Sequence, residues 1–197
     1  MQQLKLLITL ILVFGWISSA QAELYFEPYI GYGYGTIKEN STTSGSTSNT
    51  YDSSTIIWPS LSAKFGFFYD YIYLVADGRY SVIHTKEQTT ESSIPLVNMG
   101  VGIGIDFNIP IRLFYILDTS ANITVNDRAT KATGSRLSIG YYINLEALIS
   151  VEMMNATASI ENGSTTIESK ISGALLTVSF PFEFLYPRTS WKEKARQ

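Results

Sequence analysis

The sequence contains no cysteine, so neither a disulfide nor a lipid-bearing cysteine contributes to this protein. Small exported domains normally depend on disulfides, and this chain must be stable without them. Beyond residue 22 there is also no apolar run of the ~18–20 residues that a transmembrane helix needs. If the chain enters a membrane, it must therefore do so as a closed β-barrel, since hydrocarbon leaves no other way to satisfy the backbone.

Strong charge and ligand motifs are also lacking. The formal net charge is only -3, from 14 basic and 17 acidic residues, which is too mild and too mixed for nucleic-acid binding. No cluster has metal-ligand spacing, and the glycines at 100, 102 and 104 lack the order and the following helix of a nucleotide site. We therefore predict no nucleic-acid partner, no metal, no cofactor and no catalytic residue.

The N-terminal segment indicates export. Residues 1–22 hold a single charge, Lys5, then an apolar run over 6–17 and the small-residue end Ala20-Gln21-Ala22. This order is typical of a secretory signal peptide, with cleavage before Glu23. An uncleaved anchor helix is the alternative, but the run is short for a membrane span.

After residue 22, apolar and small or polar side chains alternate in eight segments. The last segment shows this most clearly, with Leu176, Val178, Phe180 and Phe182 on one parity and polar Thr177, Ser179 and Glu183 on the other. Successive side chains of a strand point to opposite faces, so one face is apolar and the other is mixed. The strands are expected at about 24–38, 55–69, 71–84, 96–107, 112–125, 135–145, 148–160 and 175–184. This predicts an all-β, eight-stranded, antiparallel up-and-down transmembrane barrel over residues 23–184.

The connections alternate in length. Polar loops rich in Ser, Thr, Asn and Gly are expected at 39–54, 85–93, 126–134 and 161–169, and short turns near 70, 108–110 and 146. Outer-membrane barrels have long extracellular loops and short periplasmic turns. Aromatic residues gather near the turns, Tyr25, Phe68, Tyr73 and Phe114 among them, and are expected to form an interfacial girdle.

Charges fall on the inner parity of the expected strands. The lumen set comprises Glu27, Lys64, Asp77, Arg79, Asp118, Arg136, Glu146, Glu152 and Glu183. An eight-stranded barrel is just wide enough for side chains to fill it, and buried charges must be paired. The prediction is a salt-bridge network that plugs the lumen; a narrow polar pore is the alternative. Strict alternation also predicts Ile57 and Ala121 facing outward and Trp58 facing inward.

On strand number, loop asymmetry and the stretch Leu176, Val178, Phe180 and Phe182, the chain resembles the small eight-stranded outer-membrane proteins of Gram-negative bacteria, of the OmpA-barrel, OmpX and opacity-protein type. The closing stretch looks like the signal read by the barrel assembly machinery, with those four side chains facing lipid. That signal usually ends the chain, whereas here residues 185–197 follow as an expected periplasmic tail. The resemblance implies a cell-surface protein in outer-membrane lipid and lipopolysaccharide, with a structural or surface-interaction role and a host or surface ligand at the loops.

Three other functions stay open. The chain could form a narrow, porin-like channel for small or apolar solutes, or a soluble lipocalin-type barrel with its apolar face inward. Less expected is a lipid A-modifying enzyme. His84, the only histidine, lies at the outer end of a strand with Ser92, Ser93, Glu87 and Glu91 nearby, but no spacing matches a triad motif.

Overall fold

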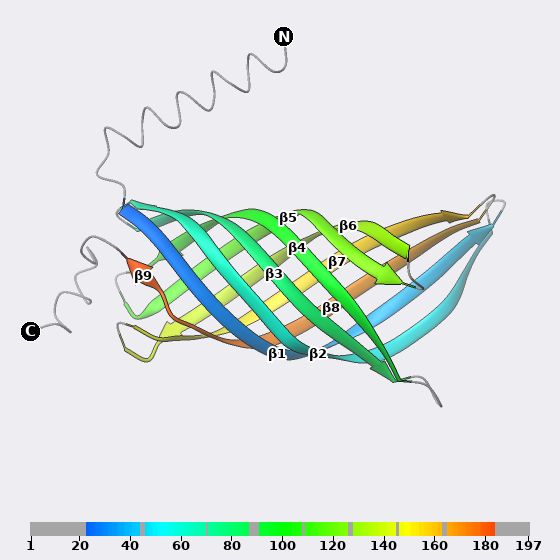
Figure 1. The fold of residues 1–197 in the computed structure, drawn as a ribbon, viewed down its shortest axis with the longest axis horizontal. Helices are drawn as coiled ribbons and strands as arrows, with labels where there is room; N and C mark the ends of the chain where they lie inside the picture. Colours follow the sequence, from blue (N-terminus) through cyan, green and yellow to red (C-terminus); the bar gives the residue numbers. More distant parts are fainter. Residues whose placement is uncertain are drawn as a thin grey trace, which may run out of the picture.

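In the computed structural model, the chain forms a closed antiparallel β-barrel (Figure 1). The structure describes residues 23–43, 46–69, 71–86, 91–107, 109–125, 128–144, 146–162 and 165–183. The predicted signal peptide and the predicted tail at 185–197 lie outside these residues. Among the described residues, no helix is long and apolar enough to cross a bilayer.

Eight long strands form the wall, which confirms the predicted fold class. They are β1 (Glu23–Thr43), β2 (Ser46–Tyr69), β3 (Ile72–Lys86), β4 (Glu91–Asp106), β5 (Ile111–Val125), β6 (Arg128–Tyr142), β7 (Leu148–Asn162) and β8 (Thr165–Ser179). A ninth element, β9 (Phe182–Glu183), follows β8 after two residues and pairs with β1 near its start.

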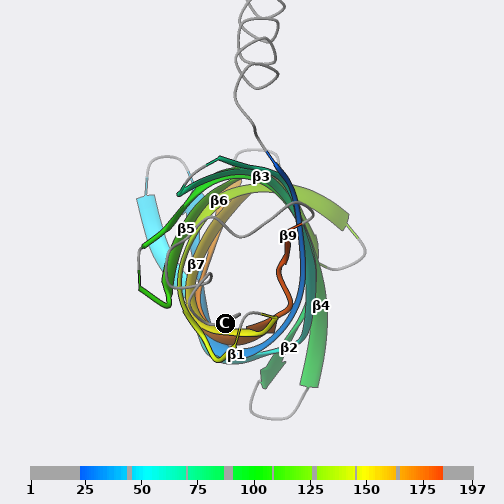
Figure 2. The ribbon, with the colours of Figure 1, turned by 90° about the vertical axis from the view of Figure 1, so that its left-hand side faces the viewer.

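Each of the eight long strands pairs with its long neighbours in sequence, and β1 also pairs with β8, which closes the ring seen in Figure 2. Following the paired residues around the barrel from Glu27 leads back to β1 at Ile37. This stagger means that the strands are tilted relative to the barrel axis, as closure requires.

The strands are longer at one end than the sequence predicts. Residues 39–54 were expected to form a loop, but β1 and β2 stay paired as far as Thr43 and Ser46. The other predicted loops are shortened in the same way, since β6 begins at Arg128 and β8 at Thr165. Backbone hydrogen bonds do not require an apolar face, and β-branched Thr favours a strand. The hairpin ends therefore extend past the segments in which apolar side chains alternate, and Figure 1 shows the β1–β2 and β7–β8 hairpins projecting from one end of the barrel.

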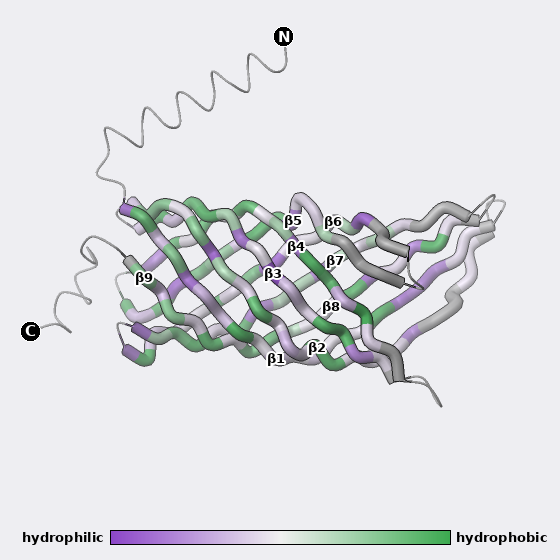
Figure 3. The backbone as a smooth tube through the Cα atoms, viewed as in Figure 1, coloured by the Kyte–Doolittle hydropathy of each residue, from purple (hydrophilic) through white to green (hydrophobic). Residues whose placement is uncertain are grey.

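The apolar parity faces outward. Leu74, Ile103 and Leu176 are about half exposed, whereas their neighbours on the other parity are buried. The alternation can be followed along the strands in Figure 3. On the closing segment, Leu176, Phe180 and Phe182 are exposed and Val178 is half-buried.

Two bulges reverse the parity of two strands. On β2, Trp58 and Pro59 stand opposite the single residue Val82 of β3, and on β5 a second irregularity lies between Asp118 and Ala121. As a result Ile57 and Ala121 are fully buried, while Trp58 is 44% exposed. The predictions for these three residues were wrong, because an extra residue shifts every later side chain to the other face.

Glycines on the inner parity make room for large side chains. A Cβ on Gly104 would lie 2.3 Å from Cε1 of Phe114, whose ring fills the space across the strand pair. Phe114 in turn packs on Tyr25 and Tyr73. By contrast, Gly78 faces outward, and nothing lies within 4 Å of a Cβ placed there.

We therefore expect Gly104→Ala to destabilise the barrel by about 1–3 kcal/mol, the usual cost of overpacking a filled interior. The matched variant Gly78→Ala should change stability by less than about 0.5 kcal/mol. Urea midpoints of both variants in phospholipid vesicles measure the difference. Equal midpoints would contradict the assignment of Gly104 to the packed interior.

Candidate functional site

The described interior side chains form three layers along the barrel. Toward the short turns lies an aromatic and aliphatic cluster comprising Tyr25, Phe68, Tyr73, Val75, Phe114 and Ile116. Toward the hairpins lies an aliphatic cluster that includes Ile37, Ile57, Ile83, Leu96, Met154 and Ile171. Between these clusters lie most of the buried charges, whereas Glu23 and Asp106 are buried at the ends of β1 and β4 near the short turns.

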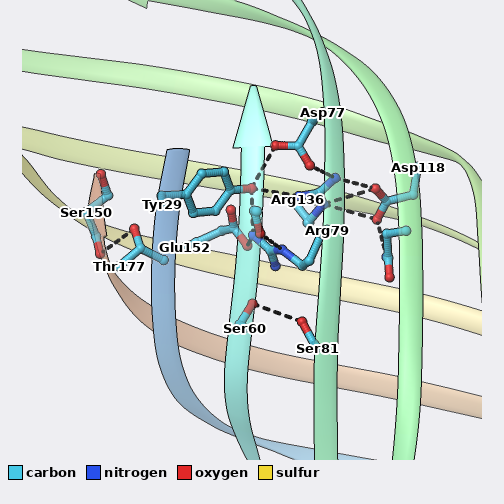
Figure 4. A network of polar contacts seen from close by, with 12 residues as sticks. Tyr29, Ser60, Asp77, Arg79, Ser81, Asp118, Arg136, Ser150, Glu152 and Thr177 are labelled. Carbon is cyan, nitrogen blue, oxygen red and sulfur yellow. Dashed lines mark hydrogen bonds and ion pairs between the residues drawn. The ribbon is translucent and has the colours of Figure 1, made fainter. Parts of the chain in front are cut away.

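Arg136 occupies the centre of the charged layer (Figure 4). Its Nη2 lies 2.6 Å from an oxygen of Asp77 and 2.6 Å from an oxygen of Asp118. The hydroxyl of Tyr29 donates to Asp77 at 2.7 Å and accepts from Arg136 at 3.1 Å and from Arg79 at 3.0 Å. One guanidinium and one phenol thus connect four strands across the lumen.

Three further ion pairs extend this layer. Arg79 pairs with Glu152 at 2.5 Å, and both side chains are buried. Glu27 accepts from Lys64 at 3.2 Å through one oxygen and pairs with Arg112 through the other. Each of these five charged groups therefore has an opposite charge in contact, as burial demands.

Arg112 joins the charged layer to the aromatic layer. The centre of its guanidinium lies 4.8 Å from the ring centroid of Phe114 and 5.3–5.6 Å from those of Tyr25, Tyr73 and Tyr142. Its Nη1 also donates to the Tyr25 hydroxyl at 2.7 Å. Cation–π attraction and a charge-assisted hydrogen bond therefore hold the arginine between the two layers.

The structure brings most of the predicted lumen residues together: Glu27, Lys64, Asp77, Arg79, Asp118, Arg136 and Glu152 all face inward and are buried. Glu146 was wrongly included. Glu146 is exposed in the connection after β6, and its backbone N–H donates to the side-chain oxygen of Asn144 at 2.9 Å. The strand ends at Tyr142, so the alternation that was expected to turn Glu146 inward does not extend to this residue. Glu183 pairs with Tyr25 through β9, but its side chain lies outside the described residues.

Several residues that contact the charged layer were not included in the lumen set predicted from the sequence. Tyr29, Arg112 and Asp106 all lie on the inner parity, which was the available signal. Aromatic residues near the turns were instead interpreted as an interfacial girdle, and that was wrong for Tyr25, Phe68, Tyr73 and Phe114, which fill the interior. Asn98 also belongs to the network, since its side-chain amide donates to Asp118 at 3.0 Å.

His84 lies on the outer surface at the hairpin side of β3. Its Nε2 is 2.7 Å from the carbonyl oxygen of Trp58, and its Nδ1 is 2.9 Å from Oγ of Ser93. Of the other nearby residues considered from the sequence, Glu87 lies outside the described residues, as do the side chains of Glu91 and Ser92. The described part of the chain has no group of three or more residues able to hold a metal ion.

No protein-family model and no curated protein matches this sequence. Among solved structures, the chain is similar to Ail, the attachment invasion locus protein of Yersinia pestis, with 11% identity and a TM-score of 0.44, over 79% of this chain and 98% of that one. It is also similar to Neisserial surface protein A, with 11% identity and a TM-score of 0.46, over 82% and 99% of the two chains. OprG, an outer membrane protein of Pseudomonas aeruginosa, shares 12% identity and a TM-score of 0.41, over 83% and 99%. No residue role is transferred from these proteins.

The charged layer predicts a strong dependence on Arg136. Arg136→Met should cost about 3–5 kcal/mol, because it leaves two buried carboxylates without their shared cation. Lys38 forms an ion pair with Asp52 in which both side chains are about 60% exposed, so Lys38→Met is a matched control that should cost less than about 1 kcal/mol. Denaturant unfolding in vesicles compares the two variants, and equal losses would contradict the assignment of Arg136 as the cation that Asp77 and Asp118 share in the buried layer.

Proposed function

We propose that this protein is an integral outer-membrane barrel with a structural or surface-interaction role, whose lumen is filled rather than open. A belt of exposed apolar side chains around the wall is the observation that carries the proposal. In a water-soluble barrel this continuous belt would face solvent, although soluble monomers rarely expose contiguous apolar patches of more than a few hundred Å².

The belt includes every described long strand. Its members include Ile30, Leu61, Phe65, Leu74, Val97, Val101, Ile103, Ile105, Tyr115, Leu117, Leu137, Ile139, Ile149, Val151, Met153 and Leu176. Among the described outward side chains of this zone, none is charged; exposed charges such as Lys38, Asp52 and Lys170 lie on the hairpin side, and Glu146 lies in a turn. A lipocalin-type barrel requires the opposite arrangement, with the apolar face inside.

Aromatic residues at both borders support a position across a bilayer. Tyr69, Phe107 and Tyr141 are exposed near the short turns, and Tyr34 and Trp58 are exposed toward the hairpins. Such girdles sit at the two lipid–water interfaces of transmembrane barrels.

The long hairpins give the protein its orientation and its contact surface. Long connections of outer-membrane barrels face outward, so the polar hairpins would meet lipopolysaccharide and surface or host ligands. The short turns would then face the periplasm, as would both termini after cleavage of the signal peptide. The outward-facing stretch Leu176, Phe180 and Phe182 suits recognition by the barrel assembly machinery.

A charge placed on the belt should block insertion according to its depth. Ile103 lies inside the outward-facing apolar run of β4, between Val101 and Ile105, so Ile103→Arg should cost up to about 2–4 kcal/mol, whereas Ile143→Arg, just beyond the end of β6, should cost about 0–1 kcal/mol. The folded fraction after refolding into vesicles, read from heat-modifiable gel mobility, measures both variants. Efficient folding of Ile103→Arg would overturn the lipid-facing assignment.

The filled interior predicts no conduction. Packed apolar clusters lie on both sides of a charged layer in which Arg136 is paired with two carboxylates, and this packing supports a filled lumen. Planar bilayers containing the purified protein should therefore show no single-channel steps above the protein-free background. Reproducible steps that change size in Arg136→Met would favour the alternative of a narrow channel for small solutes.

A further inference from the structure

We propose that Ser93 and His84 form a nucleophile–base pair on the outer rim, which hydrolyses carboxylic esters of lipids lying against the barrel. The lipid substrate rests on the proposed membrane location, but the pair itself rests only on the geometry around His84. Three features build the site: a bulge, a fixed imidazole tautomer and an exposed serine.

The bulge on β2 supplies the group that orients the imidazole. Trp58 and Pro59 stand opposite one residue of β3, so the regular ladder is interrupted at this point. Pro59 has no N–H to donate. The Trp58 carbonyl oxygen lies 2.7 Å from Nε2 of His84, on the neighbouring strand. Bulges are frequent beside active sites because they redirect groups in this way.

This contact determines the protonation pattern of the ring. A carbonyl oxygen can only accept, so Nε2 of His84 must carry the hydrogen. In the neutral imidazole Nδ1 is then an acceptor, and the hydroxyl of Ser93, 2.9 Å away, is the donor to it. A serine that donates to a histidine held in place by a third group is the arrangement of an activated nucleophile.

Strand register brings the two side chains together without a long-range contact. His84 and Ser93 are directly paired on β3 and β4, and both are exposed on the outer surface. The pair lies beyond Val82 and Tyr80 on the hairpin side of the belt. Nearby, the exposed ring of Trp58 packs against the ring of Tyr32, with 5.9 Å between the ring centroids. A lipid whose acyl chain lies along the belt would present its ester at this level, beside the aromatic rings.

The proposed reaction balances without a cofactor. Oγ of Ser93 attacks the ester carbonyl as its proton passes to Nδ1 of His84. The tetrahedral intermediate collapses by breaking the bond to the alcohol oxygen, which takes that proton from His84. Water, deprotonated by the same nitrogen, then hydrolyses the acyl-serine to a free fatty acid and regenerates the hydroxyl.

Covalent labelling tests the pair independently of the membrane. The purified full chain, folded in detergent, is treated with a fluorophosphonate probe, and the labelled residue is identified by mass spectrometry. We expect labelling at Ser93 that is lost in Ser93→Ala and retained in Ser92→Ala, since Ser92 pairs with Thr85 instead of His84. His84→Gln, which keeps an amide donor for the Trp58 carbonyl but cannot take up the proton, should slow labelling roughly 100-fold or more.

Two vesicle compositions then distinguish the source of the ester. The protein is reconstituted into phosphatidylethanolamine vesicles with and without lipopolysaccharide, and released fatty acid is measured against Ser93→Ala. Release from vesicles without lipopolysaccharide indicates a glycerol ester, and release only from vesicles that contain lipopolysaccharide indicates an acyl ester of the lipopolysaccharide.

Folding of each variant is checked by heat-modifiable mobility, so that loss of activity is separated from loss of structure. Folded wild type that is not labelled at Ser93, or equal labelling rates in wild type and His84→Gln, would overturn the nucleophile–base pair. Labelling at Ser93 without fatty-acid release from either vesicle would overturn the lipid substrate. Failure of the wild-type barrel to enter vesicles would instead contradict the proposed membrane location.

Discussion

Closure of the hydrogen-bonded ring is the constraint on which the rest of this structure depends. Hydrocarbon offers no partner to a backbone N–H or C=O, so an open sheet edge within a bilayer would cost several kcal/mol per group. Pairing of β1 with both β2 and β8 removes that edge. An eight-stranded ring is narrow enough for side chains to fill its interior, and the described inward side chains pack there in apolar and charged layers.

The filled interior then dictates which side chains can coexist. Space is limited enough that Gly104 must lack a side chain for the ring of Phe114 to fit. The remaining volume holds charges, and in this confined space each must be paired, as Arg136 is with two carboxylates and with the Tyr29 hydroxyl. Buried ion pairs of this kind are costly to break but are not strong contributors to net stability. Their contribution is to specify register, because a slip of one residue would turn Arg136 toward lipid.

The sequence predicted the parity of most strands, and the reason is physical: a wall with lipid on one side and a packed lumen on the other forces strict alternation. It predicted most of the charged layer for the same reason. It could not locate the bulges, because alternation on either side of Trp58–Pro59 looks regular when each side is considered alone. Nor could it show that Tyr25, Phe68 and Tyr73 fill the lumen, because aromatic residues near a turn suit both an interfacial girdle and an interior plug. The ends of the hairpins were missed because their strands have no apolar face to mark them.

The bulge in β2 explains why Ile57 and Trp58 were assigned to the wrong faces, and it also shapes the outer surface around His84. An extra residue on one strand turns Ile57 into the apolar cluster on the hairpin side of the charged layer, and it turns Trp58 onto the outer surface. The same irregularity interrupts the ladder beside His84, and the imidazole binds the carbonyl of Trp58. A regular strand could not do both, because alternation would place Trp58 in an interior that is already filled. The bulge therefore has two effects: it buries Ile57 in the interior and it places the Trp58 carbonyl beside His84 on the outer surface. The His84–Ser93 contact lies next to this bulge.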